Sequence, residues 1–212
     1  MRSTRPHATL ALLAALLLAC PPAGARRFMG LKQAVRSLLP EGAEVFKITR
    51  ELSEAQRARL KRDCGYELER GPHKIYLGKD ARGKTTAYVF IIQADAGDWR
   101  HRFAVGVAAD GSLRGVRVME LSNEWPEAIR TERFLSQFEG KCHTDALSVY
   151  ADIDGVTGAT VSSELTAVAA RQALSLHHLL FGGGGPVEVP EAVRKARLKG
   201  QRRIEQADRT GR

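Results

Sequence analysis

The spacing of apolar residues changes twice near the start of the chain. Near-helical spacing predicts a short helix over Leu31–Leu39, which Pro40 ends. Glu44–Ile48 then alternates between apolar and polar positions, as a half-buried strand does. A polar helix is predicted over Ser53–Arg62, with Ser53 as its N-cap. This region therefore predicts a helix, a strand and a second helix.

The middle of the chain has the period-two pattern of strands. Three segments carry it, Thr85–Ile92, His101–Ala108 and Ser112–Glu120. Between the last two, Ala109-Asp110-Gly111 is a strong hairpin signal. Helical spacing resumes over Glu127–Phe138. The middle of the chain therefore predicts an antiparallel sheet followed by a helix.

A long apolar stripe near the end of the chain predicts one more helix, Thr160–Phe181, which the glycines of 182–185 stop. Grouped strands followed by helices favour the α+β class, an antiparallel sheet with packed helices. Val187–Arg212 is rich in charges of both signs and is expected to be a flexible or loosely helical, solvated tail. Docking of this tail to a membrane surface or a partner is the alternative.

The N-terminus has the pattern of an export signal. A short basic region precedes an apolar run over Ala8–Ala19. As a helix this run reaches only about 18 Å, short of a bilayer core of about 30 Å, so it is not expected to span a membrane. Ala23-Gly24-Ala25 fits cleavage before Arg26, the favoured route. The alternative is lipidation of Cys20 within a lipobox-like Leu17-Leu18-Ala19-Cys20.

Composition adds a few limits. The chain has 212 residues, 43% of them hydrophobic, and a net charge of +9, which suits either anionic partners or a solvated basic surface. Cys64 and Cys142 could pair in an oxidising compartment, and the sequence leaves this open. A c-type haem is not expected, because the chain lacks Cys-x-x-Cys-His. Neither His143 nor the His177-His178 pair has the spacing of a metal site, so no metal is expected.

One motif carries the chemistry, the segment 152–163 just before the last predicted helix. Gly155 and Gly158 allow sharp turns and close approach of a ligand. A helix N-terminus attracts phosphate, because its first N–H groups are unsatisfied and carry partial positive charge. A phosphate-bearing hydroxyl at Thr160 would be stabilised there. The simpler interpretation is a glycine turn with Thr157 or Thr160 serving only as an N-cap.

The string Asp154-Gly155-Val156-Thr157-Gly158-Ala159-Thr160 resembles the Asp-x-x-Ser/Thr-Gly-Ala-Thr signature of the FMN-binding domain family. That family includes periplasmic flavin subunits of Rnf-type and Na+-translocating NADH:quinone oxidoreductase complexes. The segments Phe103–Val107, Asp110–Val118 and Phe134–Gly140, with Lys141 after them, are also similar to the family. The resemblance covers roughly Phe103–Leu174.

The resemblance implies that a flavin transferase joins FMN by a phosphodiester to Thr160. It implies further cofactor-binding residues around this position: Asp154, Thr157, Gly158, Ala159, Ser162, Ser163, Glu124 and Trp125. Where the family commonly has Glu-Thr-Pro-Gly, this chain has Asn123-Glu124-Trp125-Pro126-Glu127, so Trp125 could stack on the flavin or belong to the core. No catalytic side chain is expected, because the isoalloxazine supplies the redox chemistry.

The expected organisation follows from these segments. It comprises a signal peptide (1–25), an N-terminal α/β segment packed on the same domain (26–100), the FMN-binding core (101–181), and a glycine linker with a basic tail (182–212). The expected protein is an exported flavoprotein, periplasmic or on the outer face of the cytoplasmic membrane, that acts as an electron carrier or redox subunit. Its expected partners are the transferase and membrane or periplasmic redox proteins, with no nucleic acid. The alternatives are a flavin-binding sensor or maturation factor for a membrane redox complex, and an exported binding domain without flavin.

Overall fold

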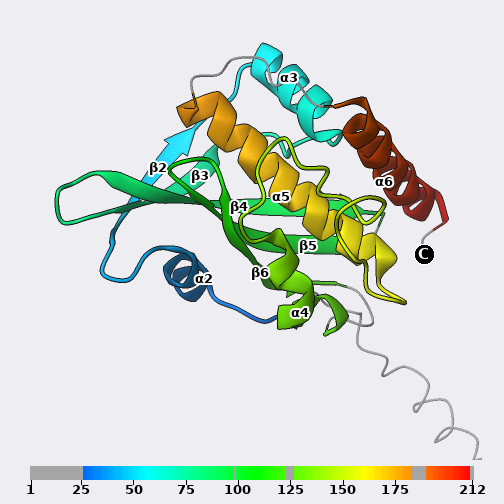
Figure 1. The fold of residues 1–212 in the computed structure, drawn as a ribbon, viewed down its shortest axis with the longest axis horizontal. Helices are drawn as coiled ribbons and strands as arrows, with labels where there is room; N and C mark the ends of the chain where they lie inside the picture. The colour runs from blue at the N-terminus through cyan, green and yellow to red at the C-terminus, as the bar shows by residue number, and fades with distance from the viewer. Residues whose placement is uncertain (1–25, 98, 123–126, 183–189, 211–212) are drawn as a thin grey trace, which may run out of the picture.

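The computed structural model describes residues 26–97, 99–122, 127–182 and 190–210. These residues form a six-stranded antiparallel sheet in the order β1-β6-β5-β4-β3-β2, with helices on both faces (Figure 1). The strands are β1 (Arg26–Arg27), β2 (Glu44–Arg50), β3 (His73–Lys79), β4 (Thr85–Ala96), β5 (Trp99–Ala108) and β6 (Leu113–Leu121). The main helices are α2 (Leu31–Leu38), α3 (Glu54–Cys64), α4 (Glu132–Leu135), α5 (Thr160–Phe181) and α6 (Glu191–Thr210). The predicted α+β class is confirmed.

Alternation along the strands divides the apolar residues between the two faces. On β4, Phe90 and Ile92 belong to the large core beneath α5, while Ala87 and Val89 belong to a smaller core beneath α2. Helix α5 crosses the first face, with α3 and α6 beside it (Figure 1). Because α5 lies between the sheet and these two helices, most of its 22 residues are buried.

Local sequence signals account for several boundaries. The Ser53 hydroxyl accepts from the Gln56 amide at 3.3 Å, and the Gln56 side chain accepts from the Ser53 amide at 2.9 Å, so the predicted cap is a full capping box. The predicted β5–β6 hairpin is also confirmed. Its Asp110 carboxylate accepts from the Ser112 amide at 2.9 Å, and Gly111 takes the positive φ of +89° that the turn requires.

Two sequence expectations in the sheet region need correction. The single helix over Glu127–Phe138 is wrong, because residues 128–138 form three short helical pieces interrupted at Thr131. Thr131 is extended (φ −67°, ψ 142°) and its hydroxyl caps the second piece, as threonine side chains at helix starts do. Strand β3 was missed, because its lysines and glycine weaken the alternation around Ile75 and Leu77.

The basic segment after the glycine run is not a solvated tail. Residues 191–210 form helix α6, which packs against α5 and β4. Ile204 and Ala207 are buried, and the Arg197 guanidinium donates to the carbonyls of Asp63 (2.6 Å) and Asp145 (2.7 Å). The buried residues of α6, Arg197 among them, lie on one face of the helix and the exposed charged residues lie on the other. The amphipathic pattern therefore depends on the order of the residues and cannot be seen in the composition of the segment.

The cysteines and the helix lengths answer two questions that the sequence raised. Cys64 and Cys142 are both free thiols, and burial raises the pKa of the Cys64 thiol. Among the residues that the structure describes, no helix has the length and apolar character needed to cross a bilayer.

Candidate functional site

Helix α5 begins at Thr160, as the apolar stripe predicted. The N-cap is Ala159, whose side chain cannot cap, so neither Thr157 nor Thr160 fills the capping role considered from the sequence. Thr160 is half-buried and its hydroxyl makes no hydrogen bond with another described residue. An uncapped N-terminus keeps backbone N–H donors available and carries the positive end of the helix dipole. The first turn of α5 therefore combines an accessible hydroxyl with a setting that favours an anion.

The two glycines of the turn before α5 differ in conformation and surroundings. Gly158 has φ +80°, a left-handed conformation that costs other residues about 1 kcal/mol or more. It is exposed, and a Cβ there would meet no atom within 4 Å. At Gly155, a Cβ would lie 3.4 Å from the Val149 side chain, which is van der Waals contact without overlap. The backbone conformation therefore requires glycine at position 158, whereas position 155 only brings the turn close to Val149.

Side chains from outside the turn hold its backbone in place. The Gln137 side-chain amide accepts from the Asp154 N–H at 2.7 Å and donates to the Asp154 carbonyl at 3.2 Å. The Ser163 hydroxyl accepts from the Val156 N–H at 3.1 Å and donates to the Ala159 carbonyl at 2.8 Å. These contacts fix the turn at both ends, while the Asp154 side chain remains exposed.

A second layer of charged contacts supports the loop that enters the motif. Lys141 Nζ lies 2.9 Å from Asp152 Oδ2, and the Ser148 amide donates to Asp152 Oδ1 at 3.1 Å. Partial burial would raise the pKa of Asp152, but the hydrogen bonds from Lys141 and Ser148 outweigh it and lower that pKa. This ion pair joins the segment after α4 to the loop, so Lys141 contributes to the shape of the motif.

A buried ion pair within α5 also contacts the loop that precedes the motif, at residues 147–149. Glu164 and Arg171 are both buried, and their side chains lie 3.1 Å apart. The Glu164 carboxylate also accepts from Ser148 Oγ (3.1 Å) and the Val149 amide (3.0 Å), and Arg171 donates to the Leu147 carbonyl. Burial raises the pKa of Glu164, and the Arg171 charge opposes that rise. Sequence reasoning missed this pair, whose only signal was two charges within the apolar stripe.

His101 of β5 lies directly behind the first turn of α5. Its Nε2 is 2.9 Å from Ser162 Oγ, and the ring is fully buried between its strand neighbours Trp99 and Phe103. Burial lowers the pKa of His101 to about 4, while the Arg100 backbone and Asp95 act in the opposite direction. The imidazole is therefore neutral at physiological pH. Its inward position in the alternating strand pattern was the signal that could have found it.

The structure brings most of the sequence-predicted residues together in this one region. Asp154, Thr157 and Gly158 are exposed in the turn, Ala159 occupies the N-cap position of α5, and Thr160 is its first residue. Ser162 and Ser163 lie on the buried side, where their hydroxyls contact His101 and the turn backbone. That placement gives the two serines a positioning role. Glu124 and Trp125 lie outside the described residues.

The histidines elsewhere do not converge on this region. His178 stacks on His143 with ring centroids 4.8 Å apart, while His177 packs edge-on against Tyr88 at 4.9 Å. Across the described ranges, no group of three or more His, Cys, Asp or Glu side chains could hold a metal ion. Two cavities formed by described residues lie away from this region, on the sheet face that α2 partly covers.

The start of α5 has an uncapped N-terminus, a glycine turn before it and an accessible hydroxyl on it, an arrangement that could hold a phosphate-bearing ligand. Residues 100–175 match the family model of the FMN-binding domain, so the chain contains a domain of this family over about a third of its length and is a flavin-binding protein. The family resemblance of the motif is thereby confirmed. A search of curated proteins found no match to the chain.

The geometry of this region is compatible with the phosphate of FMN. The phosphate would be held at the first turn of α5, where N–H donors and the helix dipole favour an anion by about 0.3–2 kcal/mol. The open space at Gly158 and the half-buried Thr160 leave room for a group on the outer side of the turn.

Proposed function

We propose that this protein carries FMN covalently through a phosphodiester at Thr160 and acts, after export, as an electron carrier or redox subunit. The observation that supports it most is the position of Thr160. Its hydroxyl lies at the first residue of α5, without a hydrogen-bond partner among the described residues, inside the segment that matches the FMN-binding domain.

The residues around Thr160 would each serve this attachment in a definite way. The first turn of α5 binds the phosphate, and Gly158 allows the chain to turn without blocking it. Gln137 and Ser163 hold the turn in its shape before the flavin is added. Asp154 presents an exposed carboxylate that the transferase could recognise. When bound, the isoalloxazine supplies the redox chemistry, and no side chain acts as a nucleophile in turnover.

Attachment joins Thr160 Oγ1 to the flavin phosphorus. The hydroxyl proton is lost, and the transferase supplies the flavin as an activated nucleotide whose remaining part leaves from phosphorus. The chain gains the mass of FMN minus water. A covalent bond suits an exported protein, because a dissociated flavin would be lost by dilution outside the membrane.

Intact mass measured after expression with and without a flavin transferase tests the attachment. We expect the increment of FMN minus water only with the transferase, and its loss in Thr160→Ala. Thr144→Ala is the matched control, since Thr144 is an exposed threonine of the same domain that lies outside the motif, and this variant should keep the increment. An unchanged mass in the presence of an active transferase would refute covalent attachment and favour a binding domain without flavin.

Separate measurements test export and electron transfer. Cell fractionation with N-terminal sequencing should find a mature chain that begins at Arg26, whereas a blocked, lipidated Cys20 would show the lipoprotein route. A redox titration of the loaded protein, followed by electron exchange with haem or quinone partners, tests the carrier role. A flavin that is bound yet exchanges no electrons with any partner would favour the sensor or maturation factor.

A further inference from the structure

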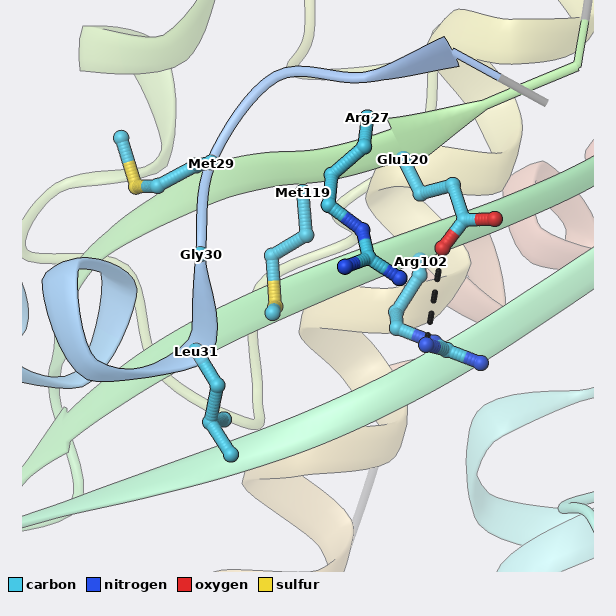
Figure 2. A pocket seen from close by; sticks show the side chains of 7 residues that line it. All are labelled: Arg27, Met29, Gly30, Leu31, Arg102, Met119 and Glu120. Carbon is cyan, nitrogen blue, oxygen red and sulfur yellow. Dashed lines mark ion pairs between the residues drawn. The ribbon is translucent and has the colours of Figure 1, made fainter.

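The sheet face opposite α5 is only partly covered, because α2 has eight residues and reaches across part of it. Two adjoining cavities of about 140 and 360 Å³ lie on the uncovered part and share Leu31, Arg102 and Met119. We call this combined depression the α2-face groove. Figure 2 shows the smaller cavity, with Arg27 and Arg102 close together beside Met119.

The floor and one lip of the α2-face groove are apolar. Tyr76, Ile91 and Met119 lie along the floor, and Met29 and Leu31 border it. Leu31 is 44% exposed, which makes it one of three large hydrophobic side chains so exposed among the described residues. An apolar strip rimmed by polar residues on a soluble domain marks an interaction surface.

The charges around the groove are mainly positive. Strand registers place five cations on this face of the sheet: Lys47, Lys74, Arg100, Arg102 and Arg117. The same registers place Asp95 and Glu120 there among the acids, and Glu69 lines the larger cavity; Glu120 is already paired with Arg102 at 3.5 Å. Arg27, from the strand that borders the groove, adds a further positive charge. The surface is therefore complementary to an anionic partner.

The chain enters the fold at the rim of this groove. Arg26 and Arg27 form β1 at the edge of the sheet, and Arg27 lines the smaller cavity. Only six residues separate Arg26 from the apolar run that ends at Ala19. Six extended residues span at most about 20 Å. On the lipoprotein route, a lipid on Cys20 would thus lie within reach of the groove, whereas after cleavage before Arg26 the groove alone would hold the protein on the membrane.

We propose that the α2-face groove docks on an anionic membrane surface. Leu31 and Met29 enter the interface between headgroups and acyl chains, while Arg27, Lys74 and Arg102 contact lipid phosphates. Docking in this orientation turns α5 and Thr160 away from the bilayer, since α5 covers the opposite face of the sheet. The proposal does not depend on flavin, so Thr160→Ala should bind membranes as the unaltered chain does.

Vesicle co-sedimentation of the full chain tests the charge contribution. Vesicles of phosphatidylcholine are compared with vesicles in which phosphatidylglycerol replaces part of it. We expect binding to the anionic vesicles, weakened as salt is raised because added salt shortens the screening length from about 10 Å at 0.1 M. Lys74→Glu with Arg102→Glu should lower the affinity at least about tenfold. The matched control, Arg202→Glu with Arg203→Glu on exposed α6 positions, makes the same charge change and should have little effect.

The methionines give a readout that separates the groove from the apolar leader. The chain has three, Met1 in the leader and Met29 and Met119 in the groove. With methyl-labelled methionine, anionic vesicles that carry a nitroxide lipid should broaden the Met29 and Met119 signals, and Leu31→Ser should reduce this effect without charge change.

Three outcomes would overturn the proposal. Broadening of Met1 alone would assign binding to the leader, and equal binding of the groove and α6 charge variants would exclude a specific surface. Met29 and Met119 shifts that follow protein concentration instead of lipid would make the groove an interface between copies of the chain. Circular dichroism of each variant establishes that it remains folded.

Discussion

Replacing Gly200 of α6 with alanine would place a methyl group against the buried Glu164 carboxylate. A Cβ built on Gly200 overlaps Glu164 Oε1 and lies 2.9 Å from Oε2. The carboxylate has no free direction in which to move, because Arg171, Ser148 and the Val149 amide hold it. Either α6 must move outward or Glu164 must give up one of these contacts.

One stabilising and two destabilising contributions determine how much this substitution changes the free energy of unfolding. Alanine in a helix interior gains about 1 kcal/mol over glycine. Forcing a methyl group into a filled site costs about 1–3 kcal/mol, and losing a hydrogen bond to a charged group costs about 1.5–3 kcal/mol. We expect Gly200→Ala to lower the free energy of unfolding by about 2–4 kcal/mol. For a chain of this length that corresponds to a fall in Tm of about 5–15 °C.

Thermal unfolding followed by circular dichroism measures this effect, and a double-mutant cycle assigns it. Glu164→Ala alone should cost about 3–5 kcal/mol, because it leaves Arg171 buried without its partner. In that background the obstacle is gone, so Gly200→Ala should become neutral or stabilising by about 1 kcal/mol. An unchanged or raised Tm for the single Gly200→Ala variant would refute the close packing of α6 on Glu164.

Three further predictions concern the attachment region. Gly158→Ala should lower the free energy of unfolding by about 1 kcal/mol, seen in urea denaturation, because alanine at φ +80° is strained; Gly30→Ala, at φ −76°, has no such strain. Gln137→Ala should slow flavin loading, followed by intact mass, while the circular dichroism spectrum stays unchanged, since the variant loses the contacts to the Asp154 backbone and one long hydrogen bond of 3.4 Å to the Phe134 carbonyl; loading at the normal rate would show that the contacts to Asp154 are dispensable. Because the pKa of His101 is lowered to about 4 in the fold from 6.5, the unfolded chain binds the proton more readily, and stability should fall by up to about 3 kcal/mol as pH drops from 6.5 to 4. His101→Gln should flatten that part of the stability–pH curve, and an unchanged slope would show that His101 does not titrate in this way.

Local sequence patterns correctly predicted those elements whose structure is determined by residues close together in the chain. The capping box at Ser53, the hairpin at Asp110–Gly111 and the limits of α5 all rest on neighbouring residues. The position of Thr160 at the first residue of α5 followed from the apolar stripe alone. The family match then supported FMN as the ligand of the domain that contains this position.

Those local patterns could not predict contacts between residues that lie far apart in the sequence. Arg197 makes hydrogen bonds to backbone 52 and 134 positions away, and without them α6 looks like a solvated charged segment. The contact of His101 with Ser162 joins residues 61 apart, so nothing near either one predicts it. Strand β3 completes its pattern only beside β4, whose register places Ile75 opposite Phe90.

The strand order has a consequence for when the attachment region can form. From β3 to β6, each strand pairs with the strand just before it in the chain, so the sheet can grow by successive hairpins as the polypeptide lengthens. Helix α5 needs the finished sheet beneath it, and α6 must then close over Glu164. The turn that presents Thr160 is therefore among the last parts to gain its final shape. A modifying enzyme that recognises this turn would act on folded chains and pass over nascent ones.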